Sequence, residues 1–391
     1  MQGKTVSVKI PRKQDHYDIR IGVGTLHDCG GWIKRCTRSE PRCIAIISNR
    51  TVFELYGEKV RKSIADAGFE VSVHLIGDGE KYKSLRTLEK TLAFLSEHKL
   101  TRTDAIVALG GGVVGDLAGF AASVYLRGIP FLQIPTTLLS MIDSSVGGKT
   151  GVNTAFGKNL IGSFYQAAGV LIDVATLATL PSRELTAGFC ESVKQGALSG
   201  YELFDQTKDF LSRTPQNPLT IRVNDSHEVS RKYLSGLVDL IASQISFKAR
   251  IVEGDEHESA AKKGRKSRKI LNFGHTFGHA LEKVTSYKRF KHGEAVGHGI
   301  VFAATLANKL ELLGQNEVKL LNDVVRLAGR LPALSGIAAG DIAEAFAYDK
   351  KQINESLQWI LLRGIGKPVI VPDTNIPRSV VTETIREILH K

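Results

Sequence analysis

The residues best suited to chemistry in this chain are concentrated in a histidine-rich stretch. Positions 271–279 read Leu-Asn-Phe-Gly-His-Thr-Phe-Gly-His, and a His-Gly-Glu triplet follows at 292–294. His275 and His279 are four residues apart, so on a helix both imidazoles leave the same face. Neutral imidazole is a common ligand of Zn²⁺, and a third ligand from elsewhere would complete a catalytic site with one open position. The alternative is two ordinary exposed or core histidines, because this spacing also arises by chance.

A carboxylate that could join the histidines lies on the helix predicted to begin at Pro181. Glu184, Glu191 and Lys194 are spaced at i, i+7 and i+10, which places them on one stripe of that helix. A solvated charged face would account for the stripe. The neighbouring residues between 187 and 197 are nevertheless mostly small or apolar, as expected where a helix is closely packed. This favours Glu191 as a metal ligand.

A glycine-rich turn follows the buried strand predicted at Ala105–Leu109. Three glycines at 110–112 allow a close backbone approach to a phosphate, at the start of a helix whose N–H groups face the anion. The turn differs from the usual G-x-G-x-x-G dinucleotide pattern and could be merely structural. Residues 77–83 also follow a strand and offer a carboxylate for ribose hydroxyls and an ammonium for phosphate, although a polar turn explains them equally well.

A dense set of polar residues follows the next buried strand. Residues 134–150 read Ile-Pro-Thr-Thr-Leu-Leu-Ser-Met-Ile-Asp-Ser-Ser-Val-Gly-Gly-Lys-Thr, and Gly-Lys-Asn follows at 157–159. Hydroxyls, a carboxylate, paired glycines and amine or amide donors are poor material for a core. They suit a polar, anionic substrate.

The run at 262–269, Lys-Lys-Gly-Arg-Lys-Ser-Arg-Lys, is the one biased segment of the chain. It is interpreted as a solvated loop, an anion-binding lid or, in third place, a nucleic-acid patch. No aromatic residues are interleaved for base stacking, which disfavours nucleic acid. Arg268 lies four residues before Asn272 and seven before His275, close enough to share their site. Its planar guanidinium matches a substrate carboxylate.

Composition limits the possible classes of function. Of the 391 residues 42% are hydrophobic and 24% charged, as in soluble globular proteins, and no apolar run reaches the roughly 18 residues of a membrane span. The N-terminus lacks the apolar region of a secretory signal. The four cysteines, Cys29, Cys36, Cys43 and Cys190, form no C-x-x-C pair and are predicted to be reduced thiols of a cytoplasmic protein. The net charge of +12 favours acidic partners, either nucleic acid or phosphorylated acids.

Alternating strand and helix patterns predict an α/β fold for the first part of the chain. Residues 5–23 alternate in the manner of a two-stranded ribbon. The other elements would form a parallel sheet with helices on both faces and ligands at the carboxyl ends of its strands. The strands are predicted at 43–48, 71–76, 105–109, 131–134 and 170–174, and the helices around 51–67, 84–98 and 114–125.

Beyond Pro181 the pattern is mostly helical. We therefore predict an N-terminal α/β nucleotide-binding domain of residues 1–180, a C-terminal mostly α-helical domain of residues 181–391, and a ligand cleft between them. The helices are predicted at 182–212, 223–253, 272–286, 293–313, 315–329 and 376–390, with one short strand at 358–362.

Taken together, these motifs resemble the 3-dehydroquinate synthase family over residues 43–366. The motifs that carry the resemblance are G-E-x-x-K-S, A-L-G-G-G-V-V-G-D, P-T-T-L-L-S, D-S-S-V-G-G-K-T, G-K-N-x-I-G, L-N-F-G-H-T-F-G-H and H-G-E-A-V. The resemblance implies binding of NAD⁺ and of one divalent metal, Zn²⁺ or Co²⁺, between two domains. It also implies the substrate 3-deoxy-D-arabino-heptulosonate 7-phosphate, which is oxidised by the cofactor, loses phosphate, is reduced again and closes to a carbocycle by an aldol step.

The resemblance also implies a role for individual residues. The metal ligands would be Glu191, His275 and His292, so that His279 would face the substrate, in contrast to the spacing argument above. The cofactor would lie on Asn49, Glu80, Lys83, Gly111, Gly112, Val113, Asp116, Thr136, Thr137, Leu139, Lys158, Thr179 and Glu184. The substrate would lie on Arg127, Asp143, Lys149, Asn159, Lys194, Lys248, Arg268, Asn272, His279 and one of Lys350 or Lys351. The arginine that matches Arg127 reaches a neighbouring subunit in the family, which implies a homodimer.

The sequence departs from the family pattern at two places, and rival functions remain. Cys190 and Ser192 flank Glu191 in the segment G-F-C-E-S-V-K, where the family more often has G-x-A-E-V-I-K, and the loop 254–269 is unusually basic. A related cyclase acting on a sugar phosphate without a carboxylate would not need Arg268 with Asn272 and His279. A metal-dependent polyol dehydrogenase would not need the phosphate-binding lysines. A nucleic-acid binder would show steep salt-dependent retention on DNA.

Overall fold

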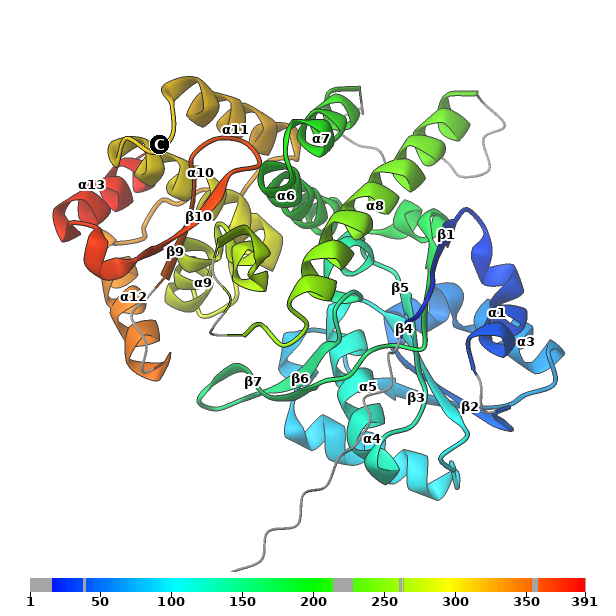
Figure 1. The fold of residues 1–391 in the computed structure, drawn as a ribbon. Coiled ribbons are helices and arrows are strands. Elements are labelled where there is room, and N and C mark those ends of the chain that lie inside the picture. The colour runs from blue at the N-terminus through cyan, green and yellow to red at the C-terminus, as the bar shows by residue number, and fades with distance from the viewer. Residues whose placement is uncertain are drawn as a thin grey trace, which may run out of the picture.

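The computed structural model describes residues 16–37, 40–213, 228–259, 262, 264–353 and 358–390, with side chains except at 228–231 and 347–353. A six-stranded parallel sheet forms its N-terminal half, in the order β1-β8-β5-β4-β2-β3 (Figure 1). The five buried strands predicted from the sequence are all confirmed to within one residue at each end. The strands are β1 (Ile19–Gly22), β2 (Cys43–Asn49), β3 (Glu70–Ile76), β4 (Ala105–Gly110), β5 (Phe131–Pro135) and β8 (Gly169–Asp173).

The sheet is enclosed because its strands are apolar on both faces. Successive residues of a strand point to opposite faces, so a strand without polar alternation must be covered twice. Ile44 and Ile46 of β2 belong to one apolar cluster, and Ala45 and Ile47 to another. The helices covering the first face are α1 (Cys29–Cys36) and α3 (Glu58–Asp66), and those on the second face are α4 (Leu85–Glu97) and α5 (Gly112–Val124).

The order of the strands reverses between β2 and β4. The chain passes from β2 to β3 at one edge, and the next strand, β4, pairs with β2 on its other side. The loops that leave two such neighbouring strands diverge and open a crevice at their carboxyl ends, where ligands of parallel sheets bind. Asn49 ends β2 and Gly110 ends β4. The glycine-rich turn therefore lies at this crevice.

The C-terminal half is mostly helical, as predicted. Helices α6 (Ser182–Ser199) and α10 (His292–Lys309) pack together and are buried along most of their length, and α9 (His275–Val284) packs beside α10. The other helices are α7 (Tyr201–Arg213), α8 (Glu228–Gly254), α11 (Gln315–Leu327), α12 (Ala339–Ile353) and α13 (Arg378–Leu389), and a small antiparallel sheet consists of β9 (Gln358–Leu362) and β10 (Pro368–Pro372). None of the described helices combines the length and apolarity needed to cross a membrane.

A projecting antiparallel hairpin follows β5 (Figure 1). It consists of β6 (Lys149–Thr154) and β7 (Gly157–Phe164), and it carries the polar residues singled out at 149–159. Several of its apolar side chains face solvent: Phe156 is 79% exposed and Leu160 57%. The sequence did not predict this hairpin, because β7 is neither an apolar run nor a one-sided alternation.

Some expectations differ from the structure. The strand at 19–22 does not form a ribbon but is an edge strand of the main sheet, where its apolar residues pair in parallel with β8; the rest of the predicted ribbon up to residue 15 lies outside the described residues. The helix predicted at 182–212 is two helices, because Gly200 between them adopts a φ of 137°. Helices α1 and α12 and strand β10 were not predicted. The division into two domains at 180–181 stays a prediction.

Candidate active site

Three residues far apart in the sequence converge where α6, α9 and α10 meet. Glu191 lies in the middle of α6, while His275 and His292 are the first residues of α9 and α10. The Nε2 atom of His275 lies 3.9 Å from Oε1 of Glu191, and Nε2 of His292 lies 3.5 Å from the same oxygen. We refer to these three residues together with His279 as the histidine cluster. Its members come from the elements that the sequence analysis singled out.

Both imidazole rings of the predicted ligand pair are held by their other nitrogen. Nδ1 of His275 lies 3.2 Å from the main-chain oxygen of Phe273, and Nδ1 of His292 lies 3.1 Å from Oε2 of Glu282. An oxygen acceptor at Nδ1 favours the tautomer that carries its proton there. The Nε2 lone pair of each ring is then free to face Glu191.

The start of α10 is held against α6 by close backbone packing and by a two-point ion pair between Arg183 and Glu294. A Cβ atom at Gly293 would lie 2.0 Å from the main-chain oxygen of Ala187, so only glycine allows this approach. The fully buried Glu294 accepts hydrogen bonds from Nε and Nη2 of Arg183, at 2.8 and 2.6 Å, and one from the N–H of Lys291. The His-Gly-Glu triplet thus places His292 against the helix that carries Glu191.

The cluster fits a divalent metal. Glu191 is 0% exposed, and neither of its carboxylate oxygens has a hydrogen bond of normal geometry, although Nζ of Lys194 lies 2.5 Å from Oε2. A buried carboxylate in this state gains strongly from a cation. Two ligands held at about 2.1 Å from a tetrahedral ion are about 3.4 Å apart, close to the separations in this cluster.

His279 offers an alternative to Glu191 as the third ligand. The nearest ligand atoms of His275, His279 and His292 all lie within 4.8 Å of one another, and the His279 side chain is exposed. Glu191 fits the role better, because its buried oxygens lack the hydrogen bonds that an exposed imidazole can obtain from water.

A buried network of charges adjoins Glu191. Lys194 lies 3.4 Å from Oδ2 of Asp143, and Lys248 donates to Oδ1 of the same residue. Burial alone would raise the pKa of the Asp143 carboxyl, but the two ammonium groups outweigh burial and hold that pKa well below its usual range. Burial opposes the charge of Lys194, and Asp143 and Glu191 outweigh it, so the pKa of Lys194 is raised. The site therefore presents fixed charges of both signs at neutral pH.

A second group of predicted substrate residues is linked by Glu258. This carboxylate accepts a hydrogen bond from Nζ of Lys149 on β6 and one from Nδ2 of Asn272, the latter at 3.3 Å. Arg268, 3% exposed, donates through Nη1 to the main-chain oxygens of Gly147 and Glu256 at 2.9 and 2.8 Å. Arg268 and Asn272 are the two ends of one short 3₁₀ helix, η9 (Arg268–Asn272).

Residues predicted to bind the cofactor gather at the carboxyl edge of the sheet. Helix α5 begins with Gly111 as its N-cap and no side-chain cap, so its first N–H groups are open to an anion. Nζ of Lys83 lies 2.5 Å from Oδ2 of Asp116 and also donates to Asn159. The predicted residues at the ends of β2, β3, β4 and β5 are Asn49, Glu80, Lys83, Gly111, Gly112, Val113, Asp116, Thr136, Thr137 and Leu139.

Three other residues predicted to bind the cofactor have partners of their own in this structure. Thr179 forms a 2.6 Å hydrogen bond with the hydroxyl of Tyr56, and Glu184 pairs with Lys291 at 2.6 Å. Lys158 lies at the start of β7 and pairs with Oε1 of Glu282 at 3.0 Å. Their assignment to the cofactor stays a prediction.

One predicted substrate residue, Arg127, lies apart from the network. Arg127 is exposed at the end of α5 opposite to the glycine-rich turn, with a left-handed φ of 69°. A helix as long as α5 spans about 20 Å, so Arg127 is far from that turn in its own chain. The side chains of Lys350 and Lys351 lie outside the described residues.

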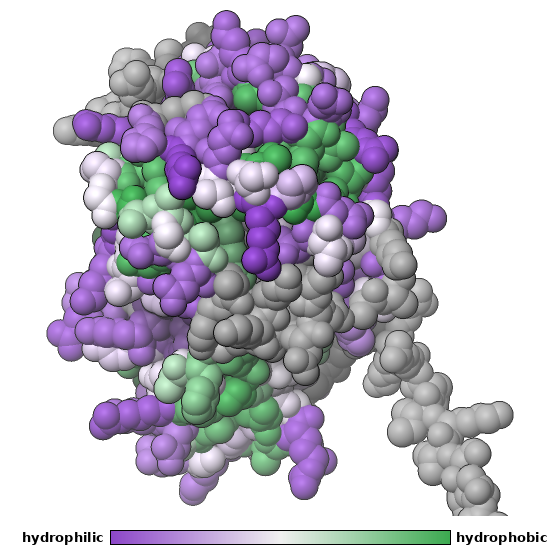
Figure 2. All heavy atoms as spheres, turned by 90° about the vertical axis from the view of Figure 1, so that its left-hand side faces the viewer, coloured by the Kyte–Doolittle hydropathy of each residue, from purple (hydrophilic) through white to green (hydrophobic). Residues whose placement is uncertain are grey.

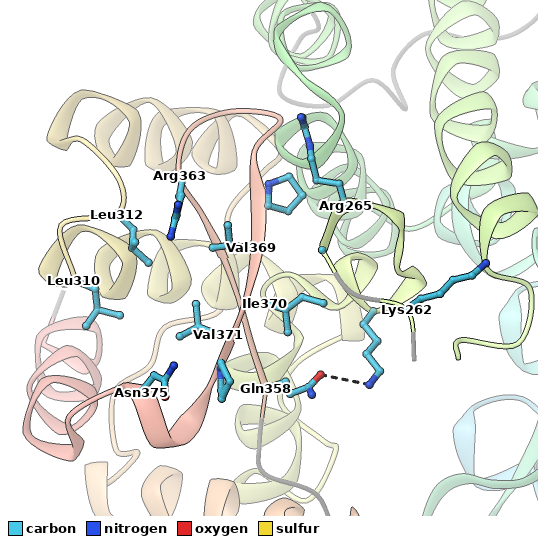
Figure 3. Close-up of a pocket in the computed structure, with 14 residues that line it drawn as sticks. Lys262, Arg265, Leu310, Leu312, Gln358, Arg363, Val369, Ile370, Val371 and Asn375 are labelled. Atoms are coloured by element: carbon cyan, nitrogen blue, oxygen red, sulfur yellow. Dashed lines mark hydrogen bonds between the residues drawn. The ribbon is translucent and has the colours of Figure 1, made fainter. Parts of the chain in front are cut away.

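A separate hollow lies beside β10 and does not include the histidine cluster (Figure 3). Its volume is about 760 Å³. Arg265 and Arg363 border it on either side of the β9–β10 pair, above a floor that includes Val369 and Val371. Figure 2 views the side that carries α13 and β10 and shows apolar areas bordered by hydrophilic side chains. None of the predicted site residues whose side chains the structure describes lines this hollow.

Two carboxylates that contact predicted site residues, Glu282 and Glu258, were not predicted from the sequence. Glu282 follows His275 by seven residues and His279 by three, so helical spacing places it on the same face, and this signal was available. Glu258 lies beside Lys149 and Asn272 only through the fold, and no spacing in the sequence indicates the contact.

Comparisons with known proteins cover nearly the whole chain. Family models described as 3-dehydroquinate synthase N-terminal and C-terminal match residues 73–187 and 188–352. A 3-dehydroquinate synthase of Geobacter sp. (strain M21) is 42% identical over 359 residues, which are 92% of this chain and 93% of the relative.

Two solved structures have a similar fold. One is ValA, a 2-epi-5-epi-valiolone synthase from Streptomyces hygroscopicus subsp. jinggangensis 5008 with NAD⁺ and Zn²⁺ bound, with a TM-score of 0.83, 26% identity and coverage of 98% of this chain and 99% of the other. The second is a 2-deoxy-scyllo-inosose synthase complexed with carbaglucose-6-phosphate, NAD⁺ and Co²⁺, with a TM-score of 0.78, 26% identity and coverage of 94% and 96%.

Proposed function

This chain belongs to the 3-dehydroquinate synthase family, and we propose that it converts 3-deoxy-D-arabino-heptulosonate 7-phosphate to 3-dehydroquinate and phosphate in the shikimate pathway. The observation that carries the proposal is the convergence of Glu191, His275 and His292 beside the charged network of Asp143, Lys194 and Lys248. One group offers a metal site and the other fixed charges for a polar, anionic substrate.

We propose Glu191, His275 and His292 as the ligands of Zn²⁺ or Co²⁺. The support is the fully buried carboxylate of Glu191, whose Oε2 pairs with Lys194 and whose Oε1 has no hydrogen bond and is faced by the two Nε2 atoms. A metal bound there would supply Lewis-acid polarisation of substrate hydroxyl groups. His279, exposed at the edge of the cluster, is then available to the substrate.

We propose that NAD⁺ binds at the crevice between β2 and β4. The turn at 110–112 supports this, because its backbone can approach a pyrophosphate and the open N–H groups of α5 can bind it. A Cβ at Gly111 would lie 3.1 Å from Cγ2 of Thr137, so a side chain would crowd this turn. The bound cofactor would supply a hydride acceptor that is regenerated within each turnover.

The protein's own residues would bind and orient the substrate. Lys194 and Lys248 offer ammonium groups at the end of the buried network, and Lys149, Asn159, Asn272 and Arg268 approach from the β6–β7 hairpin and η9. Fixed groups of this kind accelerate a reaction by holding reacting atoms in place and by stabilising charge without reorganisation. Asp143 holds both lysines in ion pairs and favours their charged forms, although burial leaves the pKa of Lys248 below its usual value.

We further propose a cytoplasmic homodimer. The exposed apolar residues of the hairpin, Phe156, Leu160 and Phe164, support a contact with a second copy of the chain, and Leu126 is a further exposed apolar residue. Arg127 belongs to the same exposed region of sequence as Leu126 and would reach the partner's site. All four cysteines are free, which agrees with a reducing compartment. Neither a nucleic acid nor a membrane is part of this proposal.

The test is an assay of phosphate release from three sugar phosphates. We expect release from the heptulosonate phosphate with catalytic NAD⁺ and no accumulation of NADH, and little from sedoheptulose 7-phosphate or glucose 6-phosphate. Removal of the metal by a chelator should abolish the activity, and added Zn²⁺ or Co²⁺ should restore it. Preference for a carboxylate-free substrate would overturn the proposal.

Arg268 is expected to determine the preference for a carboxylate. In Arg268→Lys the charge is kept but the planar fork is lost, so the activity ratio between the natural substrate and an analogue without the carboxylate should fall by about 10²-fold. Because both substrates are measured on one variant, damage to the fold cancels in the ratio. Lys266→Ala, at an exposed neighbouring position, should leave the ratio unchanged. Equal losses for both substrates would refute this role of Arg268.

A further inference from the structure

Glu282 is a buried carboxylate with two partners from different parts of the fold. Its residue is 3% exposed. Oε2 accepts from Nδ1 of His292 at 3.1 Å, and Oε1 accepts from Nζ of Lys158 at 3.0 Å. His292 begins α10, whereas Lys158 comes from the β6–β7 hairpin of the N-terminal half. The two carboxylate oxygens of Glu282 thus accept hydrogen bonds from residues of two different elements, α10 and β7.

The contact with His292 decides which way this ring faces. With Nδ1 bonded to Glu282, the opposite nitrogen lies 3.5 Å from Oε1 of Glu191. His275 differs, because its ring is held by a main-chain oxygen that no substitution removes. Among the described residues, Glu282 is therefore the side chain that orients an imidazole of the cluster. Carboxylates in this relation to a metal-binding histidine typically affect metal affinity about 10- to 100-fold.

Lys158 connects the hairpin to this carboxylate. Its ammonium also lies 4.2 Å from the centre of the Tyr287 ring, so it is held between an anion and an aromatic face. The next residue, Asn159, accepts a hydrogen bond from Lys83 and so binds the start of β7 to the loop that follows β3. Lys158 and Asn159, which are consecutive, thus bind the hairpin to the C-terminal and the N-terminal half of the protein, respectively.

We propose that Glu282 is a positioning residue for His292, and that Lys158 couples the docking of the β6–β7 hairpin to the formation of the metal site. The proposal rests on the function proposed above, because it concerns the same metal. It assigns to Lys158 a role different from cofactor binding. A site assembled in this way binds metal tightly only when the hairpin, with Lys149 and Asn159, is in place for the substrate.

The test is titration of the metal-free protein with Co²⁺, followed by visible absorption and by competition with a chelator. Glu282→Gln keeps the length and loses the charge, whereas Glu282→Asp keeps the charge and shortens the reach. Both should bind Co²⁺ about 10- to 100-fold more weakly and with an altered absorption spectrum. Activity should return at high Co²⁺ concentration, as expected for a residue that acts through a ligand.

Lys158→Met separates the two roles considered for this lysine. It should weaken Co²⁺ binding several-fold and leave the affinity for NAD⁺ unchanged, and thermal unfolding of the metal-free variant measures separately the stability lost with the Lys158–Glu282 ion pair. Lys288→Met removes an exposed lysine from the neighbouring loop and should change neither affinity. A loss of NAD⁺ affinity with unchanged Co²⁺ affinity would overturn the coupling.

Failure of this proposal can be told apart from failure of the proposed function. Native protein that binds Co²⁺ together with Glu282 variants of unchanged affinity and spectrum would overturn the positioning role alone. Native protein that binds no Co²⁺ would overturn the metal-dependent function and the positioning role together.

Discussion

Glu191→Gln is expected to lower the rate of phosphate release by roughly 10³-fold, because Lewis-acid stabilisation contributes several kcal/mol and each tenfold change corresponds to about 1.4 kcal/mol. The substitution keeps the size of the side chain and removes the negative charge that a metal needs. Glu191 is fully buried, so no water can replace it as a partner. Metal content after dialysis and phosphate release measure the two effects.

A matched control for Glu191→Gln lies on the next helix. Glu202 is exposed in the first turn of α7, and Glu202→Gln should retain both metal and activity. If His279 were the third ligand in place of Glu191, Glu191→Gln would retain the metal and His279→Ala would lose it. Retention of metal and of activity in Glu191→Gln would contradict the ligand assignment.

Asp143→Asn is expected to destabilise the metal-free protein by about 3–5 kcal/mol, the usual cost of removing one partner of a buried ion pair. Lys194 and Lys248 have side chains only 1% and 7% exposed and would be left with insufficient negative charge. Urea unfolding measures the loss. Asp66→Asn, at an exposed position on α3, should change stability by no more than about 0.5 kcal/mol.

The stability that Asp143 contributes is expected to decrease at acidic pH. The folded pKa of Asp143 is depressed, so its contribution is complete above the unfolded value of about 4 and is lost as the pH falls further. The difference between native protein and Asp143→Asn should therefore shrink below about pH 4. Adding Lys248→Met to Asp143→Asn should recover part of the stability, because it removes one unpaired charge. Equal unfolding midpoints for native protein and Asp143→Asn would contradict this account.

The sheet could be predicted from the sequence because the apolar pattern that indicates each strand lies within the strand itself. Strands such as Cys43–Asn49 are largely apolar runs bounded on both sides by turn or loop residues. Because both faces of such a strand are buried, few other structures fit the pattern. The hairpin at 149–164 could not be predicted in this way. Its second strand is largely exposed, and its pairing depends on a short turn between two polar segments.

The candidate site was predictable in part for the same reason. Helical spacing brings His275 and His279 together, and their ring centres are 5.3 Å apart in the structure. The approach of Glu191 depends on the packing of α6 against α10; the small and apolar neighbours of Glu191 favoured it as a ligand, but no spacing in the sequence links it to His275 and His292. Glu282 was on the predicted helical face and was overlooked, whereas the contacts of Glu258 require the hairpin to be in place.

The contact between α10 and the turn before α9 has a consequence for how such proteins diverge. Gly274 has a left-handed φ of 79°, and a Cβ at Gly299 would lie 1.8 Å from its main-chain oxygen, so the two backbones touch. Any mutation that separates them would also displace His275, which follows Gly274 directly. Several residues proposed to face the substrate lie on other elements, the β6–β7 hairpin and η9. Substitutions in these elements would therefore change the proposed substrate contacts while leaving undisturbed the helix pair that carries the proposed metal ligands His275 and His292.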